Sequence, residues 1–509
     1  MKFCVILIIM TIVGFVKPAN ILSVYPCPSI SHQVVFRPLT LELLKRGHRM
    51  TVITPDPMYP KGGHKNLTEI DVHDISYSVI KKYLASHVTG SKSDLINQVK
   101  GIMDLISISF EEQMKTEEVQ NVINNNNETY DLILIEAIYV QALAISHVIK
   151  APTILISSFG MYLGIHELMG IPTHPILYHS MFRQRLYNLT LLEKAKEVYN
   201  QIVINYEVKI REEKENEVLK NIFGPDTPPI SVLKNYVDLL FVNLHPIWEG
   251  NHPVPPNVVY MGGLQVQART PKTLPQDLQQ LLDSSENGVI YFSFGTNVNL
   301  QTLLPPEKIQ IFENVFSQLP YNVIWRRDND RVVIKSDNIK VYQWVPQADL
   351  LRHRNVKLFI TQGGLQSTDE AIIAGVPLLG VPLLADQWYN VEKYIKHGIG
   401  QKVDFEDITE YMLKNAILEV AEGEKYKKNI VRLRSLMADQ PEAPLQRAIW
   451  WIDYVLRHGG AKHLRAPIAN ITWTEFLQLD LIMFIAFVTV SIPMHRGKII
   501  AYFYLIGYT

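Results

Sequence analysis

Residues 344–387 hold the side chains and the spacing that a nucleotide site requires. Within them an apolar run, residues 356–361, predicts a buried parallel strand. Gly363 and Gly364 follow this run as a turn, and a helix is expected to start near Ser367. Such a turn attracts phosphate, because the backbone comes close and the unpaired N–H groups and dipole of the helix favour an anion.

Polar and aromatic side chains lie on both sides of this turn. Trp344 lies upstream and offers a flat ring to a base, while Glu370, one helical turn in, offers a carboxylate to ribose hydroxyls. A second apolar run, residues 376–384, ends at Asp386 and Gln387. The whole stretch therefore predicts a nucleotide site that ends in two polar groups suited to a sugar.

A histidine near the N-terminus is a second candidate for chemistry. Residues 21–25 predict a strand, residues 34–46 a helix and residues 50–54 a second strand, which is a βαβ unit of a parallel sheet. His32 lies in the loop after the first strand, at the edge where open α/β sheets bind ligands. An imidazole can deprotonate a hydroxyl. The chain has 16 histidines, so from composition alone a surface or capping role is the ordinary explanation.

The stretch that begins at Trp344 resembles the signature of the UDP-glycosyltransferase family, whose members glycosylate small lipophilic molecules. In animal members the signature reads W-x-P-Q, a spacer, T-H-G-G-x-x-S-x-x-E-A and then D-Q. The matching residues are Trp344, Gln347, Thr361, Gly363, Gly364, Ser367, Glu370, Ala371, Asp386 and Gln387. The chain departs from the signature at Gln362, where the family has histidine.

This resemblance implies the α/β GT-B fold, in which two Rossmann-like domains face each other across a cleft. It also implies these donor contacts: Trp344 on uracil; Val345 and Gln347 on the uracil edge and ribose; Glu370 on ribose hydroxyls; Ser293, Gly295, Thr296, Gln362, Gly364 and Ser367 on or near the diphosphate; Asp386 and Gln387 on the sugar. The turn at residues 293–296 is also compatible with an ordinary αβ turn. An amide at position 362 should hold phosphate less firmly than an imidazolium, because it cannot become a cation.

The resemblance implies a catalytic pair as well. The segment PSISHQVVFRPL looks like the acceptor loop of animal members, which makes His32 the base that deprotonates the acceptor. Glu136, after an expected strand at residues 130–135, would orient His32 and stabilise its imidazolium. Many vertebrate members have Asp there, and a solvated carboxylate at a strand end is the alternative. His48 is interpreted as structural.

The reaction implied is a single inverting displacement that moves a hexose, glucose in preference to glucuronic acid, from a UDP-sugar to a lipophilic alcohol or phenol. Asp328-Asn329-Asp330 could hold a metal, but it lies among arginines in a loop that varies in the family, and we interpret it as a solvated turn. No metal and no cofactor are therefore expected. Two alternatives are a lumenal GT-B binding protein with little catalysis and a phosphorylase-like or glycan-extending GT-B enzyme.

Length and composition bound the organisation. A chain of 509 residues suggests two or three domains, and a net charge of -1 gives no reason to expect nucleic acid. The expected division is a signal peptide at residues 1–19, an acceptor domain at 20–263, a linker at 264–275, a donor domain at 276–460 and a membrane-proximal tail at 461–509. The sequence leaves an oligomer open.

Both ends of the chain suggest the secretory pathway. An apolar N-terminal run follows Lys2, as in a signal peptide, with a buried first strand as the alternative. Residues 477–494 are apolar and precede basic residues, which predicts a single span of the endoplasmic reticulum membrane with lumenal catalytic domains, or else a helix on the membrane surface. Asn66, Asn127, Asn188 and Asn470 begin glycosylation sequons. Cleavage would leave Cys27 as the single cysteine, so no intrachain disulfide is expected.

Overall fold

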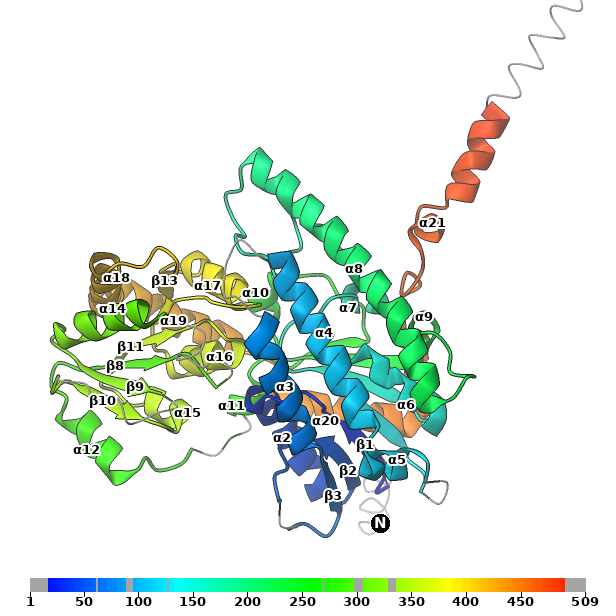
Figure 1. Ribbon diagram of the computed structural model, residues 1–509, viewed down its shortest axis with the longest axis horizontal. Coiled ribbons are helices and arrows are strands. Elements are labelled where there is room, and N and C mark those ends of the chain that lie inside the picture. Colours follow the sequence, from blue (N-terminus) through cyan, green and yellow to red (C-terminus); the bar gives the residue numbers. More distant parts are fainter. Residues whose placement is uncertain are drawn as a thin grey trace, which may run out of the picture.

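The structure, a computed structural model, describes residues 17–60, 63–87, 95–125, 128–267, 269, 271–296, 305–327 and 336–489. Two bodies, each built on a sheet with helices around it, lie side by side (Figure 1). Most of the predicted signal peptide, the Asp328–Asp330 motif and the sequon at Asn127 lie outside the described residues.

The first sheet has the strand order β3-β2-β1-β4-β5-β6-β7. All neighbouring strands in it are parallel. The strands are β1 (Asn20–Val24), β2 (Arg49–Thr54), β3 (Leu67–Asp71), β4 (Leu132–Glu136), β5 (Thr153–Ser157), β6 (Val237–Val242) and β7 (Val258–Tyr260). The helices are α2 (Ile30–Lys45), α3 (His73–His87), α4 (Leu95–Met114), α5 (Glu117–Ile123), η2 (Val140–Ala142), α6 (Leu143–Ile149), α7 (Ile165–Met169), α8 (Leu191–Phe223), α9 (Ile230–Leu233), η3 (Lys234–Tyr236), α10 (Pro246–Glu249) and α11 (Leu264–Gln267).

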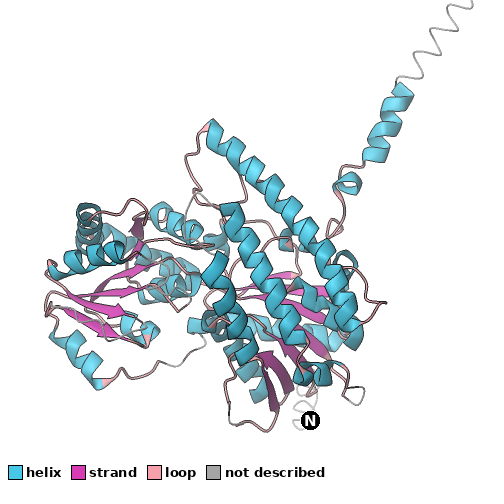
Figure 2. Cartoon of the chain, in the orientation of Figure 1, coloured by secondary structure: helices cyan, strands magenta, loops and turns pink. Residues whose placement is uncertain are grey.

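The second sheet has the order β10-β9-β8-β11-β12-β13 and is also parallel between all neighbours. Its strands are β8 (Val289–Ser293), β9 (Asn322–Arg326), β10 (Ile339–Tyr342), β11 (Val356–Thr361), β12 (Leu378–Gly380) and β13 (Gly400–Lys402). Its helices are α12 (Gln276–Ser284), α14 (Pro306–Ser317), α15 (Gln347–Leu351), α16 (Leu365–Ala374), α17 (Gln387–Lys396), α18 (Glu410–Glu422) and α19 (Glu424–Ala438). Figure 2 shows the helices around both sheets.

The central strands are apolar because they are covered on both faces. All residues of β4, LILIE, are buried, and so are all residues of β8, VIYFS. Parallel strands with helices on both faces have no solvent side, so they read as continuous apolar runs. The one charged side chain in these two strands, Glu136, has to be satisfied inside the protein.

Helix α20 (Pro444–His458), which follows the helices of the second sheet in the chain, packs against the first sheet. In α20, the residues Ala448, Ile449, Ile452 and Val455 pack in one cluster with residues of α2 and β1. The expected donor domain of residues 276–460 includes α20, but this helix is amphipathic and its apolar face packs against the first sheet. The expected linker also differs, since it begins with α11, whose Leu264 joins the same cluster.

After η4 (Lys462–Leu464) and α21 (Trp473–Phe476), residues 479–489 form a helix that points away from the body (Figure 1). Over the residues that the structure describes, each helix is too short or too little apolar to cross a bilayer. The predicted span, residues 477–494, extends beyond these residues.

Candidate active site

A cavity of about 680 Å³ opens between the two sheets and is lined from both bodies. It brings together side chains that the sequence separates by hundreds of residues. The predicted residues that line it are His32, Ser293, Gly295, Thr296, Trp344, Val345, Gln347, Gln362, Gly364, Ser367, Glu370, Asp386 and Gln387. Glu136 lies directly behind His32.

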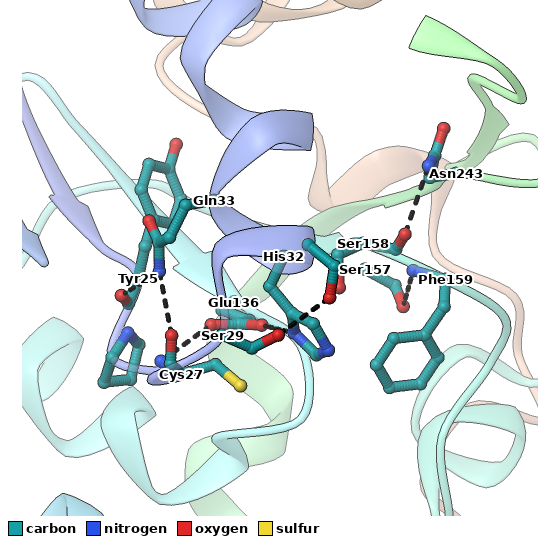
Figure 3. A network of polar contacts seen from close by, with 12 residues as sticks. Tyr25, Cys27, Ser29, His32, Gln33, Glu136, Ser157, Ser158, Phe159 and Asn243 are labelled. Carbon is teal, nitrogen blue, oxygen red and sulfur yellow. Dashed lines mark hydrogen bonds and ion pairs between the residues drawn. The ribbon is translucent and has the colours of Figure 1, made fainter. Parts of the chain in front are cut away.

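His32 and Glu136 meet because their strands are neighbours. β1 pairs with β4, so the first turn of α2 lies beside the end of β4. His32 Nδ1 is 2.6 Å from Glu136 Oε1, and Glu136 Oε2 accepts from the Cys27 backbone N–H at 3.1 Å (Figure 3). Glu136 has no exposed surface, so the alternative of a solvated carboxylate is wrong.

This contact orients the imidazole. An ionised carboxylate only accepts hydrogen bonds, so Nδ1 carries the proton and Nε2 offers a lone pair. The His32 side chain keeps 14% of its surface exposed, and the ring meets Phe159 edge-on at 5.2 Å between centroids. The pair therefore has the geometry of a general base with an orienting acid.

Gln347 links several donor-site residues. It begins α15, and its Oε1 accepts from the Tyr291 hydroxyl at 3.1 Å. Its Nε2 donates to Ser367 Oγ at 3.0 Å and to Glu370 Oε2 at 2.7 Å. Burial raises the pKa of Glu370 to about 6, although the Gln347 bond opposes this shift. The Gln347 amide thus holds the Glu370 carboxylate in place at the cavity wall.

Trp344 lies between β10 and α15 and is 65% exposed. A large aromatic ring at a cavity mouth is a stacking surface, because a base that covers it removes apolar area from water. The indole of Trp344 is therefore accessible, as the expected contact with uracil requires.

The turn that is expected to hold phosphate is formed by the ends of two paired strands. Ser293 of β8 pairs with Thr361 of β11, so the two loops that follow lie side by side. Gly295 has φ +71°, and a Cβ there would lie 2.8 Å from Gln362 Nε2. Gln362 is buried, and its Oε1 has no partner among the described residues. No described side chain caps α16, which leaves its first N–H groups for an anion.

The last two predicted residues open α17. Gln387 Oε1 accepts from the backbone N–H groups of Leu383 and Leu384, each at 2.8 Å. These two bonds turn the NH₂ group of Gln387 away from that stretch of backbone. Asp386 Oδ2 accepts from Asn390 Nδ2 at 2.8 Å. Burial raises the pKa of Asp386 to about 6.

Two residues of the site were missed from the sequence. Arg326 ends β9, next to the β8 turn, lines the cavity and donates from Nη1 to the Gly295 carbonyl at 2.6 Å. A cation at this place can balance the charge of a diphosphate. Arg326 could have been predicted from the sequence, because it ends a strand, as Ser293 does. Asn390 was missed because nothing in the sequence shows that its amide meets Asp386.

The part of the cavity near His32 is largely apolar. The residues that line it come from α3, α4, the loops after β4 and β5, and the segment that leads to α8. The apolar and aromatic residues that line it are Ile80, Ile102, Leu105, Ile106, Ile138, Phe159, Tyr162, Met181 and Phe182. This chamber suits a lipophilic molecule.

The sequons differ in their surroundings. Asn188 is exposed, and Asn66 is partly exposed. The Asn470 amide instead donates to the Ser231 carbonyl at 2.7 Å and to Asn235 Oδ1 at 3.1 Å. A glycan on Asn470 would replace these contacts, so this sequon is a poor acceptor in the folded chain.

Comparisons with known proteins agree with this architecture. The family model for UDP-glucoronosyl and UDP-glucosyl transferase matches residues 20–506. The ecdysteroid UDP-glucosyltransferase of Spodoptera littoralis nuclear polyhedrosis virus is 34% identical over 504 residues, which cover 95% of this chain and 97% of the relative. UDP-glucosyltransferase 2 of Dactylopius coccus is 31% identical over 478 residues, 92% of this chain and 90% of the relative.

A solved structure shows the fold. Arabidopsis thaliana UGT89C1, crystallised with UDP-L-rhamnose, superposes with a TM-score of 0.57 at 15% identity, over 87% of this chain and 99% of that chain. The expected GT-B fold is thus confirmed. With the family match across almost the whole chain, the protein belongs to the UDP-glucoronosyl and UDP-glucosyl transferase family and is a UDP-glycosyltransferase.

Proposed function

We propose that the protein transfers glucose from UDP-glucose to a hydroxyl of a small lipophilic acceptor, with inversion and without a metal. The observation that carries the proposal is the His32–Glu136 pair, at 2.6 Å, in the same cavity as Trp344, Glu370 and Asp386. In this proposal, a base for the acceptor and a set of groups for the UDP-sugar lie in the same cavity. The alternative of a binding protein is not favoured, because it gives no reason for an oriented base.

The mechanism is one displacement. His32 Nε2 takes the proton of the acceptor hydroxyl while the oxygen attacks the anomeric carbon. The bond from that carbon to the UDP oxygen breaks, and UDP leaves with the electron pair. Glu136 stabilises the imidazolium, and Arg326 and the N-terminal N–H groups of α16 stabilise the charge on the leaving diphosphate. One displacement inverts the anomeric centre.

The acceptor class follows from the chamber near His32. Its walls are aliphatic and aromatic, which favours a fused-ring or phenolic lipophile over a polar glycan. The relatives named as ecdysteroid UDP-glucosyltransferases make a polyhydroxylated steroid the first acceptor to test and support glucose as the sugar. A glycan-extending reaction is not favoured by the same walls.

We extend the proposal to location: the catalytic domains lie in the lumen of the endoplasmic reticulum, and the C-terminal apolar segment attaches them to its membrane. This rests on the N-terminal apolar run and on residues 477–494 of the sequence. Several apolar side chains of the helix at residues 479–489, such as Met483, Phe484 and Phe487, are more than half exposed to solvent. Resistance of the full-length protein to alkaline extraction from microsomes would support attachment, and release would contradict it.

The test uses full-length protein in microsomal membranes. It is incubated with UDP-glucose or UDP-glucuronic acid and a panel of ecdysteroids and phenols, and glycosides are detected by mass and their anomeric configuration by NMR. We expect β-glucosides. Chelator should leave turnover unchanged. A product that retains the α configuration, or donor binding without any glycoside, would contradict the proposal.

A further inference from the structure

Helix α10 of the first body contacts helix α17 of the second next to the sugar end of the cavity. Trp248 of α10 is 1% exposed, and its indole Nε1 donates to Asn390 Oδ1 of α17 at 3.3 Å. The Trp248 carbonyl accepts from Lys393 Nζ, also on α17. The indole further packs on Tyr394 and stacks on His397, with centroids 6.2 and 5.7 Å away. The two helices are therefore joined by polar and aromatic contacts.

Asn390 passes this contact on to the sugar end. Its Nδ2 donates to Asp386 Oδ2 at 2.8 Å and to the Gly363 carbonyl at 2.9 Å. Asn390 is 2% exposed, so water has little access to it. One buried amide thus connects the first body, the glycine turn and the carboxylate that we assign to the sugar.

The Trp248 N–H is the third contact of this amide. Nδ2 donates to two acceptors, Asp386 and Gly363, so Oδ1 faces the opposite way and accepts the indole N–H. Without that donor, the buried Oδ1 has lost its partner, and the side chain can shift away from the carboxylate to find another. The orientation of Asp386 therefore depends on a residue of the opposite body.

We infer that Trp248 is a positioning residue for the donor sugar, which acts through Asn390 on Asp386 and completes the sugar subsite only when α10 is docked on α17. The inference rests on the proposed role of Asp386. The inference couples docking of the two bodies to recognition of the sugar. Recognition of the nucleotide is not coupled in this way, because its expected contacts, Trp344, Gln347 and Glu370, all belong to the second body.

The test separates sugar from nucleotide. Trp248→Phe keeps an aromatic ring but removes the indole N–H together with part of the buried ring, and the control below loses the same ring atoms without losing a hydrogen bond. We expect the KM for UDP-glucose to rise roughly three- to tenfold, as for a lost bond that orients a charged group. The inhibition constant of UDP, which has no sugar, should stay within twofold of the wild type, taking about 0.4 kcal/mol as unchanged.

The matched control is Trp325→Phe in β9. Trp325 is equally buried, and its indole N–H has no hydrogen-bond partner among the described residues, so the same substitution should leave both constants unchanged. Asn390→Ser is the second variant, and it should reproduce the selective rise if Trp248→Phe fails to fold.

The outcomes separate the two proposals. If Asp386→Asn raises the KM for UDP-glucose but Trp248→Phe and Asn390→Ser do not, the positioning role is overturned and the proposed function stands. A parallel rise of the UDP inhibition constant in Trp248→Phe would also overturn it, because the effect would then be general. If Asp386→Asn changes nothing, the sugar assignment and this inference both fall.

Discussion

His32 Nδ1 and Glu136 Oε1 lie 2.6 Å apart, and the second carboxylate oxygen of Glu136 accepts the Cys27 backbone N–H. Glutamate thus bridges the base and the acceptor loop. Each oxygen of its carboxylate has one of these partners. The substitution of Glu for the Asp of many vertebrate members is therefore compatible with an oriented base.

Replacing His32 tests the base directly. In His32→Ala we expect turnover to fall by roughly 10²- to 10⁴-fold, the usual contribution of general base catalysis. Binding of UDP-glucose, measured by calorimetry, should be unchanged because the donor contacts lie elsewhere in the cavity. Substantial turnover in this variant would remove His32 from the mechanism.

Glu136 allows a graded test of orientation. Glu136→Asp should keep the carboxylate and lose part of the activity, while Glu136→Gln loses the charge that stabilises the imidazolium and should lose much more. We expect the kcat of Glu136→Gln to fall by at least tenfold relative to Glu136→Asp, about 1.4 kcal/mol. Equal activity of the two variants would show that the charge has no role.

Trp344 offers a test that does not disturb the fold. Because its ring is 65% exposed, Trp344→Ala should leave the melting temperature unchanged. Donor and UDP affinity should both weaken by about 1–3 kcal/mol, as for base–aromatic stacking. Tyr411, which is 77% exposed and does not line the cavity, provides the control substitution. Unchanged UDP binding in Trp344→Ala would exclude the stacking role.

The elements could be predicted well where one periodic run decides them. Residues 356–361 were expected as a strand with the bounds that β11 has. The helix of His32 begins at Ile30, four residues before the expected start, because the polar SISHQ segment hides it from an apolar period. That shift moves His32 from a loop into the first turn of α2.

The contacts between distant residues could not be predicted from the residues alone. Neither the return of α20 to the first sheet nor the Trp248–Asn390 bond has a local pattern, because both depend on how the two bodies dock. The pairing of His32 with Glu136 was expected only through a family resemblance. Its physical cause, the adjacency of β1 and β4, is a property of strand order that periodicity does not contain.

Gln362 is the departure from the family pattern, and Gln362→His tests its effect. The side chain lies against Gly295, in the turn that faces the expected diphosphate. A protonated imidazole would make a charge-assisted bond where the amide makes a neutral one. We therefore expect tighter UDP binding below neutral pH, by about 0.5–1.5 kcal/mol, and loss of that gain as the pH rises above 7. A pH-independent affinity equal to the wild type would show that this position does not meet the phosphates.

The raised pKa values of Asp386 and Glu370 predict how binding of the UDP-sugar depends on pH. Burial raises the pKa of each carboxyl to about 6, above the ordinary values of 3.8 and 4.5. Above pH 6 both carboxylates are ionised and accept hydrogen bonds from the hydroxyls of the UDP-sugar. The KM for UDP-glucose should therefore rise as the pH falls from 7 to 5. The effect on stability has the opposite sign: because the folded state binds these protons more tightly than the unfolded state, the free protein loses stability as the pH rises through 6.

Asp386→Asn connects the two effects. At pH 7.5 the variant no longer has a partly buried charge at this position, so we expect it to melt at a higher temperature than the wild type while its KM for UDP-glucose is higher. At pH 5, where Asp386 is mostly protonated, both differences should shrink. Differential scanning calorimetry and donor kinetics at the two pH values measure this. A variant less stable than the wild type at pH 7.5 would show that the ionised Asp386 is fully compensated by its neighbours and that its burial imposes no cost on the fold.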